Sequence, residues 1–134
     1  MASIRLEMNL RADPWNAWDA VRDVGAIHTR LAPDFVTDVK MDGDARIVTF
    51  ANGMVARELI VDLDDAQRRL VWAAVGGRLS HHNASVQVFD EGAGRCRLVW
   101  IADLLPHELK PAIEAMVDQG IAAIQRTLES AARA

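Results

Sequence analysis

Every second residue between positions 4 and 10 is apolar, and this period is typical of a strand with one buried face. Asp13-Pro14 predicts the start of a helix, because an aspartate accepts hydrogen bonds from free backbone N–H groups and proline suits the first helical position. Trp15 and Trp18 fall on one face of that helix, so we expect both in the core. A second short helix is expected over Ile27–Leu31.

From residue 34 to residue 105, short apolar runs alternate with turn signals. The turns are expected at residues 42–44, 52–53, 64–65, 76–77 and 91–94. Asn52-Gly53 predicts a type I′ hairpin with positive φ at both residues. About six strands joined by such short loops favour an antiparallel meander over βαβ units.

After Pro106 the apolar period changes to that of a helix, and one long amphipathic helix is expected from about residue 108 to residue 132. Gly120 lies in its middle, where glycine costs roughly 1 kcal/mol against alanine. Either tight packing against the sheet or space for a ligand would explain this glycine. The predicted fold is α+β: a seven-stranded curved antiparallel sheet wrapped around the C-terminal helix, with two short helices between strands 1 and 2.

The composition narrows the class of protein. Residues 1–134 are expected to form one domain, and 51% of them are hydrophobic and 25% charged. A net charge of −4 argues against a nucleic-acid partner. Cys96 is the only cysteine, and no apolar run reaches the roughly 20 residues of a membrane span. With no secretory signal pattern at the N-terminus, we expect a cytoplasmic protein.

The order of the expected elements, together with motifs along nearly the whole chain, resembles the helix-grip superfamily (SRPBCC). This superfamily includes START lipid-transfer domains, polyketide cyclase/dehydratase-like proteins, the major birch pollen allergen (Bet v 1) and plant abscisic-acid receptors. The likeness is greatest to small bacterial polyketide cyclase-like members. The motifs are Trp18-Asp19-Ala20-Val21-Arg22-Asp23, Arg57-Glu58-Leu59, Leu63-Asp64-Asp65, Val75-Gly76-Gly77-Arg78-Leu79 and Asn83-Ala84-Ser85-Val86, followed by Trp100, Asp103 and Pro106.

The resemblance implies a ligand cavity between the concave side of the sheet and the last helix. Glu58 matches a pocket glutamate of the hormone receptors, and Asn83 and Ser85 match pocket residues on a later strand. On this basis the ligand is expected to contact Glu58, Trp72, Ala74, His81, Asn83, Ser85, Ile101, Val117, Ile121 and Gln125.

Hydrophobic alternation gives a different orientation for two of these strands. Over residues 81–88, apolar patterning turns His82, Ala84, Val86 and Val88 inward, whereas the resemblance turns His81, Asn83, Ser85 and Gln87 inward. Similarly, Glu58 does not share a face with Val55, Leu59 and Val61. Both orientations stay open at the level of sequence.

Departures from the hormone receptors are equally informative. The Asn52-Gly53 hairpin replaces their gate loop, and only Arg78-Leu79 is left of their latch motif. No lysine corresponds to the one that anchors the hormone carboxylate, and the chain has no tyrosine. Hormone reception is therefore disfavoured, and so is any mechanism that needs a phenol.

Three functions follow as hypotheses. The first is binding of a small hydrophobic or amphipathic ligand. The second is a polyketide cyclase/dehydratase-like enzyme, in which desolvation raises the pKa of Glu58 for general acid/base catalysis and Asn83 polarises a carbonyl. The third is an interaction module with no cavity, which a cavity of at least roughly 300 Å³ would exclude.

No cofactor is expected in any of these roles. The four histidines and Cys96 lack the spacing of a zinc site, and the glycine-containing turns match no nucleotide-binding loop. A small molecule is thus the expected partner.

Overall fold

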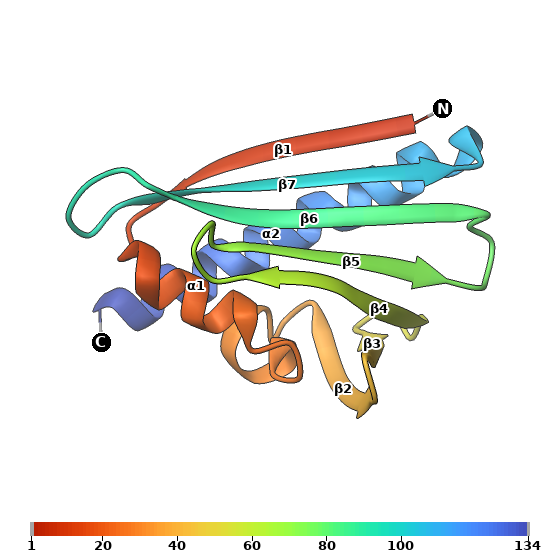
Figure 1. The fold of residues 1–134 in the computed structure, drawn as a ribbon, viewed down its shortest axis with the longest axis horizontal. Coiled ribbons are helices and arrows are strands. Elements are labelled where there is room, and N and C mark those ends of the chain that lie inside the picture. Colours follow the sequence, from red (N-terminus) through yellow and green to blue (C-terminus); the bar gives the residue numbers. More distant parts are fainter. Residues whose placement is uncertain (1, 134) are drawn as a thin grey trace.

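The computed structural model describes residues 2–133, and the expected α+β architecture is confirmed. Seven strands form one antiparallel sheet in the order β1-β7-β6-β5-β4-β3-β2 (Figure 1). The strands are β1 (Ala2–Leu10), β2 (Val36–Asp42), β3 (Ala45–Phe50), β4 (Val55–Asp64), β5 (Arg69–Val75), β6 (His81–Asp90) and β7 (Cys96–Leu105). The helices are α1 (Pro14–Arg22), the π-helical turn η1 (Ile27–Leu31), the 3₁₀ turn η2 (His107–Leu109) and α2 (Lys110–Arg133).

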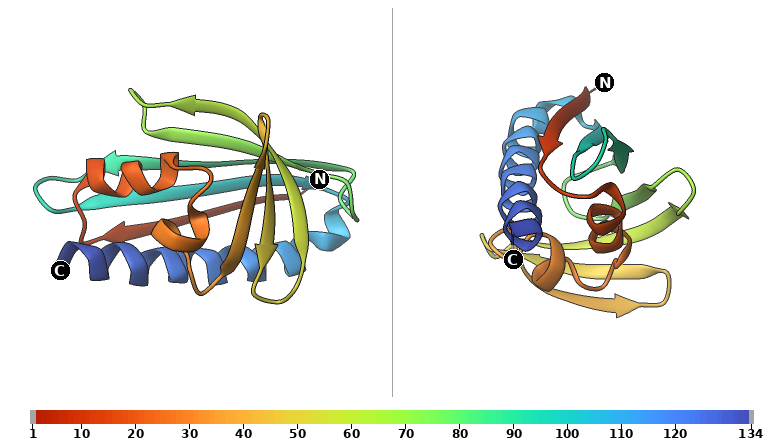
Figure 2. Two further views of the ribbon diagram at one scale, coloured as in Figure 1. Left: turned by 90° about the horizontal axis from the view of Figure 1, so that it is seen from below. Right: turned by 90° about the vertical axis from the view of Figure 1, so that its left-hand side faces the viewer.

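The sheet curls around α2. In Figure 2 the helix runs along the length of the sheet, and the end-on view shows the strands bending around it from β1 to β2. Helix α2 contacts β1 on one side and η1 on the other. The concave face of the sheet, α1 and α2 therefore enclose the core.

Helix α1 begins at the expected cap and is fastened to the turn between β4 and β5. The Asp13 carboxylate accepts hydrogen bonds from the backbone N–H groups of the second and third helical residues, at 2.8 and 3.2 Å. Trp18 is only 2% exposed, and its Nε1 donates to Asp65 Oδ1 at 2.8 Å. Arg22 Nε donates to the same oxygen at 2.7 Å. One carboxylate thus ties α1 to the sheet at two points.

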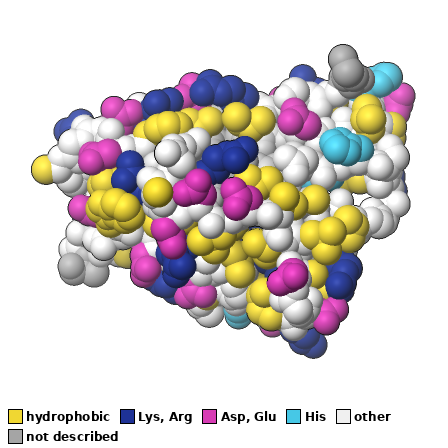
Figure 3. Space-filling model, in the orientation of Figure 1, with side chains coloured by type: hydrophobic (Ala, Val, Ile, Leu, Met, Phe, Trp, Pro, Cys, Tyr) yellow, Lys and Arg dark blue, Asp and Glu magenta, His cyan; other side chains and the backbone are white. Residues whose placement is uncertain are grey.

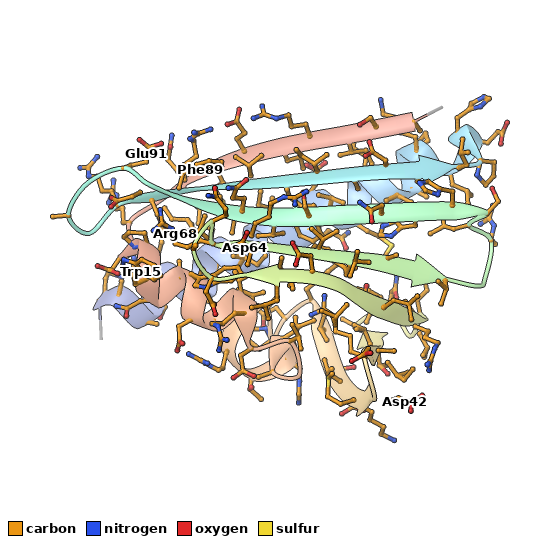
Figure 4. All side chains as sticks on the ribbon, in the orientation of Figure 1. Trp15, Asp42, Asp64, Arg68, Phe89 and Glu91 are labelled. Atoms are coloured by element: carbon orange, nitrogen blue, oxygen red, sulfur yellow. The ribbon has the colours of Figure 1, made fainter. Side chains whose placement is uncertain are left out.

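Trp15 corrects the expectation that both tryptophans of α1 are core residues. Its side chain is 55% exposed and lies under the guanidinium of Arg68, 4.9 Å from the ring centroid (Figure 4). Since α1 is short and lies at the end of the sheet, only one of the two indoles reaches the interior. Trp15 instead forms a surface cation–π pair.

The expected turns are confirmed in position, but the Asn52-Gly53 turn is not of type I′. Only Gly53 has positive φ, at 90°. Asn52 turns the chain with its side chain, because its Oδ1 accepts the backbone N–H of Met54 at 2.9 Å. The hairpin therefore stays tight without a second left-handed residue.

Gly120 is explained by tight packing. A Cβ at this position would lie 3.0 Å from both Phe35 Cε2 and Trp100 Cζ3, closer than the ordinary carbon–carbon contact of roughly 3.5–4.0 Å. The absence of a side chain lets these two rings lie against the helix backbone. Gly120 thus sets the distance between α2 and the sheet.

The outer face of the sheet carries several apolar side chains. The space-filling view from this side shows apolar side chains in several patches, with charged side chains between them (Figure 3). Val55, Leu59, Val61 and Val75 are 62, 39, 57 and 41% exposed. Among residues 2–133, no helix is long and apolar enough to cross a bilayer.

Candidate functional site

A cavity of about 140 Å³ lies between the concave face of the sheet and α2. Typical pockets for drug-sized ligands begin near 300 Å³, whereas an apolar cavity of roughly 150 Å³ holds one molecule of benzene. Met54, which is 48% exposed, marks a point where the lining reaches the surface. Most of the lining is apolar, and it includes Val21, Leu31, Val36, Val48, Leu70, Trp72, Ala74, Val86, Trp100, Ala102, Ile113, Val117 and Ile124.

An ion pair is buried in this lining. Arg46 on β3 lies opposite Glu58 on β4, and Arg46 Nε donates to Glu58 Oε1 at 2.8 Å. The two side chains are 4 and 10% exposed. Because each residue takes the inward position of its strand, the pair faces α2 rather than solvent.

Two further groups interact with the Arg46 guanidinium. Its Nη1 donates to the carbonyl oxygen of Val24 at 3.3 Å, and its guanidinium lies 5.4 Å from the centroid of the Trp72 ring. Burial raises the pKa of Glu58 above its ordinary value, while the charge and the hydrogen bond of Arg46 oppose that rise. A carboxyl group that takes up a proton more readily than usual therefore borders the cavity.

His82 on β6 also lines the cavity. Its Nδ1 accepts the backbone N–H of Ala74 at 2.9 Å, next to the last paired residues of β5 and β6, Trp72 and Ala84. An accepting Nδ1 places the hydrogen of the neutral ring on Nε2. Burial, reinforced by His81, lowers the pKa of His82, so the neutral ring is the form that this site favours.

Two indoles from the concave face of the sheet form part of the cavity wall. Trp72 and Trp100 meet edge to face, with ring centroids 5.7 Å apart. Trp100 Nε1 is buried and finds no acceptor among residues 2–133. The wall is therefore aromatic and carries one N–H group without a protein partner.

The structure brings four of the expected contact residues to the cavity: Glu58, Trp72, Ala74 and Val117. Asn83, Ser85 and His81 lie on the outward-facing side of β6, because Ala84 and Val86 take the inward positions. The resemblance therefore gave the wrong orientation for this strand, and hydrophobic alternation gave the right one.

The remaining residues expected to contact the ligand also lie outside the cavity lining. Ile101 pairs with Ser85 on the outer face of the sheet, whereas its neighbours Trp100 and Ala102 face inward. Ile121 and Gln125 lie on α2 but outside the lining, where the helix presents Val117 and Ile124 instead. The polar contacts expected from Asn83, Ser85 and Gln125 are thus absent from the described cavity.

Sequence reasoning missed Arg46 and His82. The hairpin contained a signal for Arg46, because this residue and Glu58 are equally far from the turn at residue 52 and must therefore pair. His82 was assigned to the apolar face of its strand, but a histidine among apolar residues gave no sign that it would bind a backbone N–H group. Within residues 2–133, no three His, Cys, Asp or Glu side chains gather closely enough to hold a metal ion.

Comparison with known families matches residues 1–133 to a model described as "Polyketide cyclase / dehydrase and lipid transport". A comparison of the sequence with curated proteins found no match.

Solved structures support the same fold. A protein from Thermobifida fusca is 26% identical, with a TM-score of 0.78 over 96% of this chain and 91% of the other. The protein XoxI from Bacillus cereus is 14% identical, with a TM-score of 0.83 over 96% of each chain. Norcoclaurine synthase from Thalictrum flavum, solved in complex with dopamine and hydroxybenzaldehyde, is 17% identical, with a TM-score of 0.71 over 96% of this chain and 84% of the other.

Proposed function

We propose that this chain, which belongs to the polyketide cyclase / dehydrase and lipid transport family, binds a small apolar molecule, or the apolar end of an amphipathic one, in the cavity between the sheet and α2. The observation that carries the proposal is the cavity itself: about 140 Å³ lined mainly by aliphatic and aromatic side chains. Such a space, if left empty, forfeits packing energy, and an apolar ligand recovers it.

The charges at the cavity favour an uncharged ligand. Arg46 and Glu58 compensate each other at 2.8 Å, and the lowered pKa of His82 keeps that ring neutral. A charged molecule would bring an uncompensated charge into an apolar enclosure, which costs several kcal/mol.

The size of the cavity favours one ring or a short alkyl chain. The Trp72 and Trp100 rings provide a flat apolar surface on which a ring can stack. Norcoclaurine synthase, which has the same fold, is described in complex with two single-ring molecules, and this supports a ligand of that size.

A matched pair of alanines on β5 tests the proposal. Ala74 lines the cavity, whereas Ala73 pairs with Leu59 on the outer face of the sheet. Native mass spectrometry of protein purified from its own host is expected to show a bound small molecule in the wild type and in Ala73→Leu, but not in Ala74→Leu. Isotope-labelled benzene, followed by NMR, serves as a defined probe. If benzene does not bind the wild-type protein, the proposal fails.

An enzyme of the cyclase/dehydratase kind is the second candidate, and the raised pKa of buried Glu58 favours it. Glu58 would act as general acid or base, but Asn83 faces outward and cannot polarise a substrate in the cavity. Chemical conversion of the bound molecule by the wild type and not by Glu58→Gln would support catalysis. Equal conversion by both proteins would exclude Glu58 as the catalytic group.

A further inference from the structure

Two aromatic rings separate the cavity from a second space. Phe35 and Phe50 line the cavity and also line a surface groove of about 290 Å³, which we call the outer groove. This groove lies between α2, the segment before β2 and the β3–β4 hairpin. The two rings meet edge to face with centroids 5.2 Å apart. The partition between the two spaces is therefore one layer of side chains thick.

The backbone beneath the partition is held more firmly than the Phe35 ring. The Phe35 N–H donates to the carbonyl oxygen of Ala32 at 3.0 Å, and its carbonyl oxygen accepts the Ala51 N–H at 2.9 Å. The ring itself is held by packing alone, against Phe50, against the bare helix surface at Gly120 and against the hydrophobic core. Reorientation of the ring would open the partition without breaking either backbone hydrogen bond.

The two spaces differ in chemistry. The outer groove is bordered by polar side chains from three segments, and its only opposite charges, on Arg126 and Asp34, lie 3.5 Å apart and compensate each other. In contrast, the lining of the cavity is mainly apolar, and its charged groups, Arg46 and Glu58, are already paired with each other. The uncharged polar residues of the outer groove are Asn52 and Gln119.

We propose that the outer groove is the polar compartment of the same binding site. An amphipathic ligand places its apolar end in the cavity, passes between Phe35 and Phe50, and leaves an uncharged hydroxyl- or amide-bearing end beside Asn52 and Gln119. This inference rests on the proposed function and extends it to a class of ligand. Volume supports it, because the cavity of about 140 Å³ falls below the roughly 300 Å³ of a typical ligand pocket, whereas cavity and outer groove (about 290 Å³) together exceed it.

Three probes separate the compartments. Benzene fills the cavity only, 4-phenylbutan-1-ol reaches the outer groove with its hydroxyl group, and n-pentylbenzene has the same number of non-hydrogen atoms without the hydroxyl. Ala122→Trp blocks the outer groove, since Ala122 lines it and does not line the cavity. Ala115→Trp is the matched control, because Ala115 lies exposed on the same helix and lines neither space.

Affinities from NMR titration or calorimetry give a clear result. We expect Ala122→Trp to lower the affinity for 4-phenylbutan-1-ol about tenfold, a change of about 1.4 kcal/mol in binding free energy. The affinity for benzene should stay within about twofold of that of the wild type. Ala115→Trp should change neither affinity, and the wild type should prefer the alcohol to n-pentylbenzene.

Two outcomes overturn the inference while the proposed function stands. In the first, benzene binds but Ala122→Trp leaves the affinity for 4-phenylbutan-1-ol unchanged. In the second, n-pentylbenzene binds to the wild type as tightly as the alcohol does. Absence of benzene binding overturns the proposed function itself. Ala51→Trp enters the outer groove from the hairpin and repeats the test if Ala122→Trp does not fold.

Discussion

Removing one member of the buried Arg46–Glu58 pair should destabilise the protein far more than removing both. With side chains only 4 and 10% exposed, loss of one partner leaves a desolvated charge and costs about 3–5 kcal/mol. Total stability of a domain is about 5–15 kcal/mol, so this is a large share of it. For a chain of 134 residues, Glu58→Gln should lower the melting temperature by roughly 10–20 °C. The double variant Arg46→Met/Glu58→Leu should come within about 1 kcal/mol of the wild type.

The two single variants should differ in their dependence on pH. Arginine does not lose its proton, so the Glu58→Gln variant has no titrating group in this pair. Because the pKa of Glu58 in the wild type is raised, the stability difference between wild type and Glu58→Gln should shrink as pH rises through that pKa. In Arg46→Met, Glu58 keeps a pKa raised by burial and loses the opposing pull of Arg46. Its raised pKa means that stability is full below the ordinary value of 4.5 and declines as pH rises through the folded-state pKa.

Urea unfolding followed by tryptophan fluorescence between pH 5 and pH 8 measures both effects. The wild type, Arg46→Met, Glu58→Leu and the double variant form a double-mutant cycle, whose coupling term isolates the pair. A loss below about 1 kcal/mol in Glu58→Gln, which is typical of a surface pair, would refute the reasoning that this pair is desolvated.

Three further predictions concern packing, pH and helix capping. Gly120→Ala should destabilise the protein by about 1 kcal/mol, because the clash with Phe35 and Trp100 exceeds the gain in helix propensity; a higher melting temperature would show that the rings yield. Stability should fall as pH drops below 6.5, since the folded-state pKa of His82 is lowered and the unfolded chain takes up the proton first; His82→Gln, measured by chemical unfolding over the same range, should lose this component. Asp13→Ala should cost about 1 kcal/mol in thermal unfolding, because it removes the acceptor for two N–H groups; an unchanged melting temperature would mean that water replaces the cap at no cost.

Much of the fold was accessible from the sequence, because its signals are local and strong. Alternation over residues 4–10, the caps at Asp13-Pro14 and the helical period after Pro106 each identify one element, and the structure confirms them. The prediction that Trp15 lies in the core was wrong. The apolar face of a helix indicates where a core could lie, but not how far the sheet extends to cover it.

The site was less accessible, because a strand pattern cannot say which of two faces turns toward the helix. On β6 the apolar alternation should have outweighed the resemblance, since Ala84, Val86 and Val88 leave the core incomplete if they face outward. The sequence analysis did not single out the partition formed by Phe35 and Phe50. The pairing of β2 with β3 places Val36 opposite Phe50 and so brings the two rings together.

The pairing of β1 with β7 has a consequence for biosynthesis. The first strand hydrogen-bonds along its whole length to residues 96–104, so its partner is synthesised only after strands β2 to β6. Until then β1 leaves the ribosome with an open edge, and such an edge attracts other extended chains. Chains stalled before residue 96 should therefore depend on chaperones more than chains that have released β7.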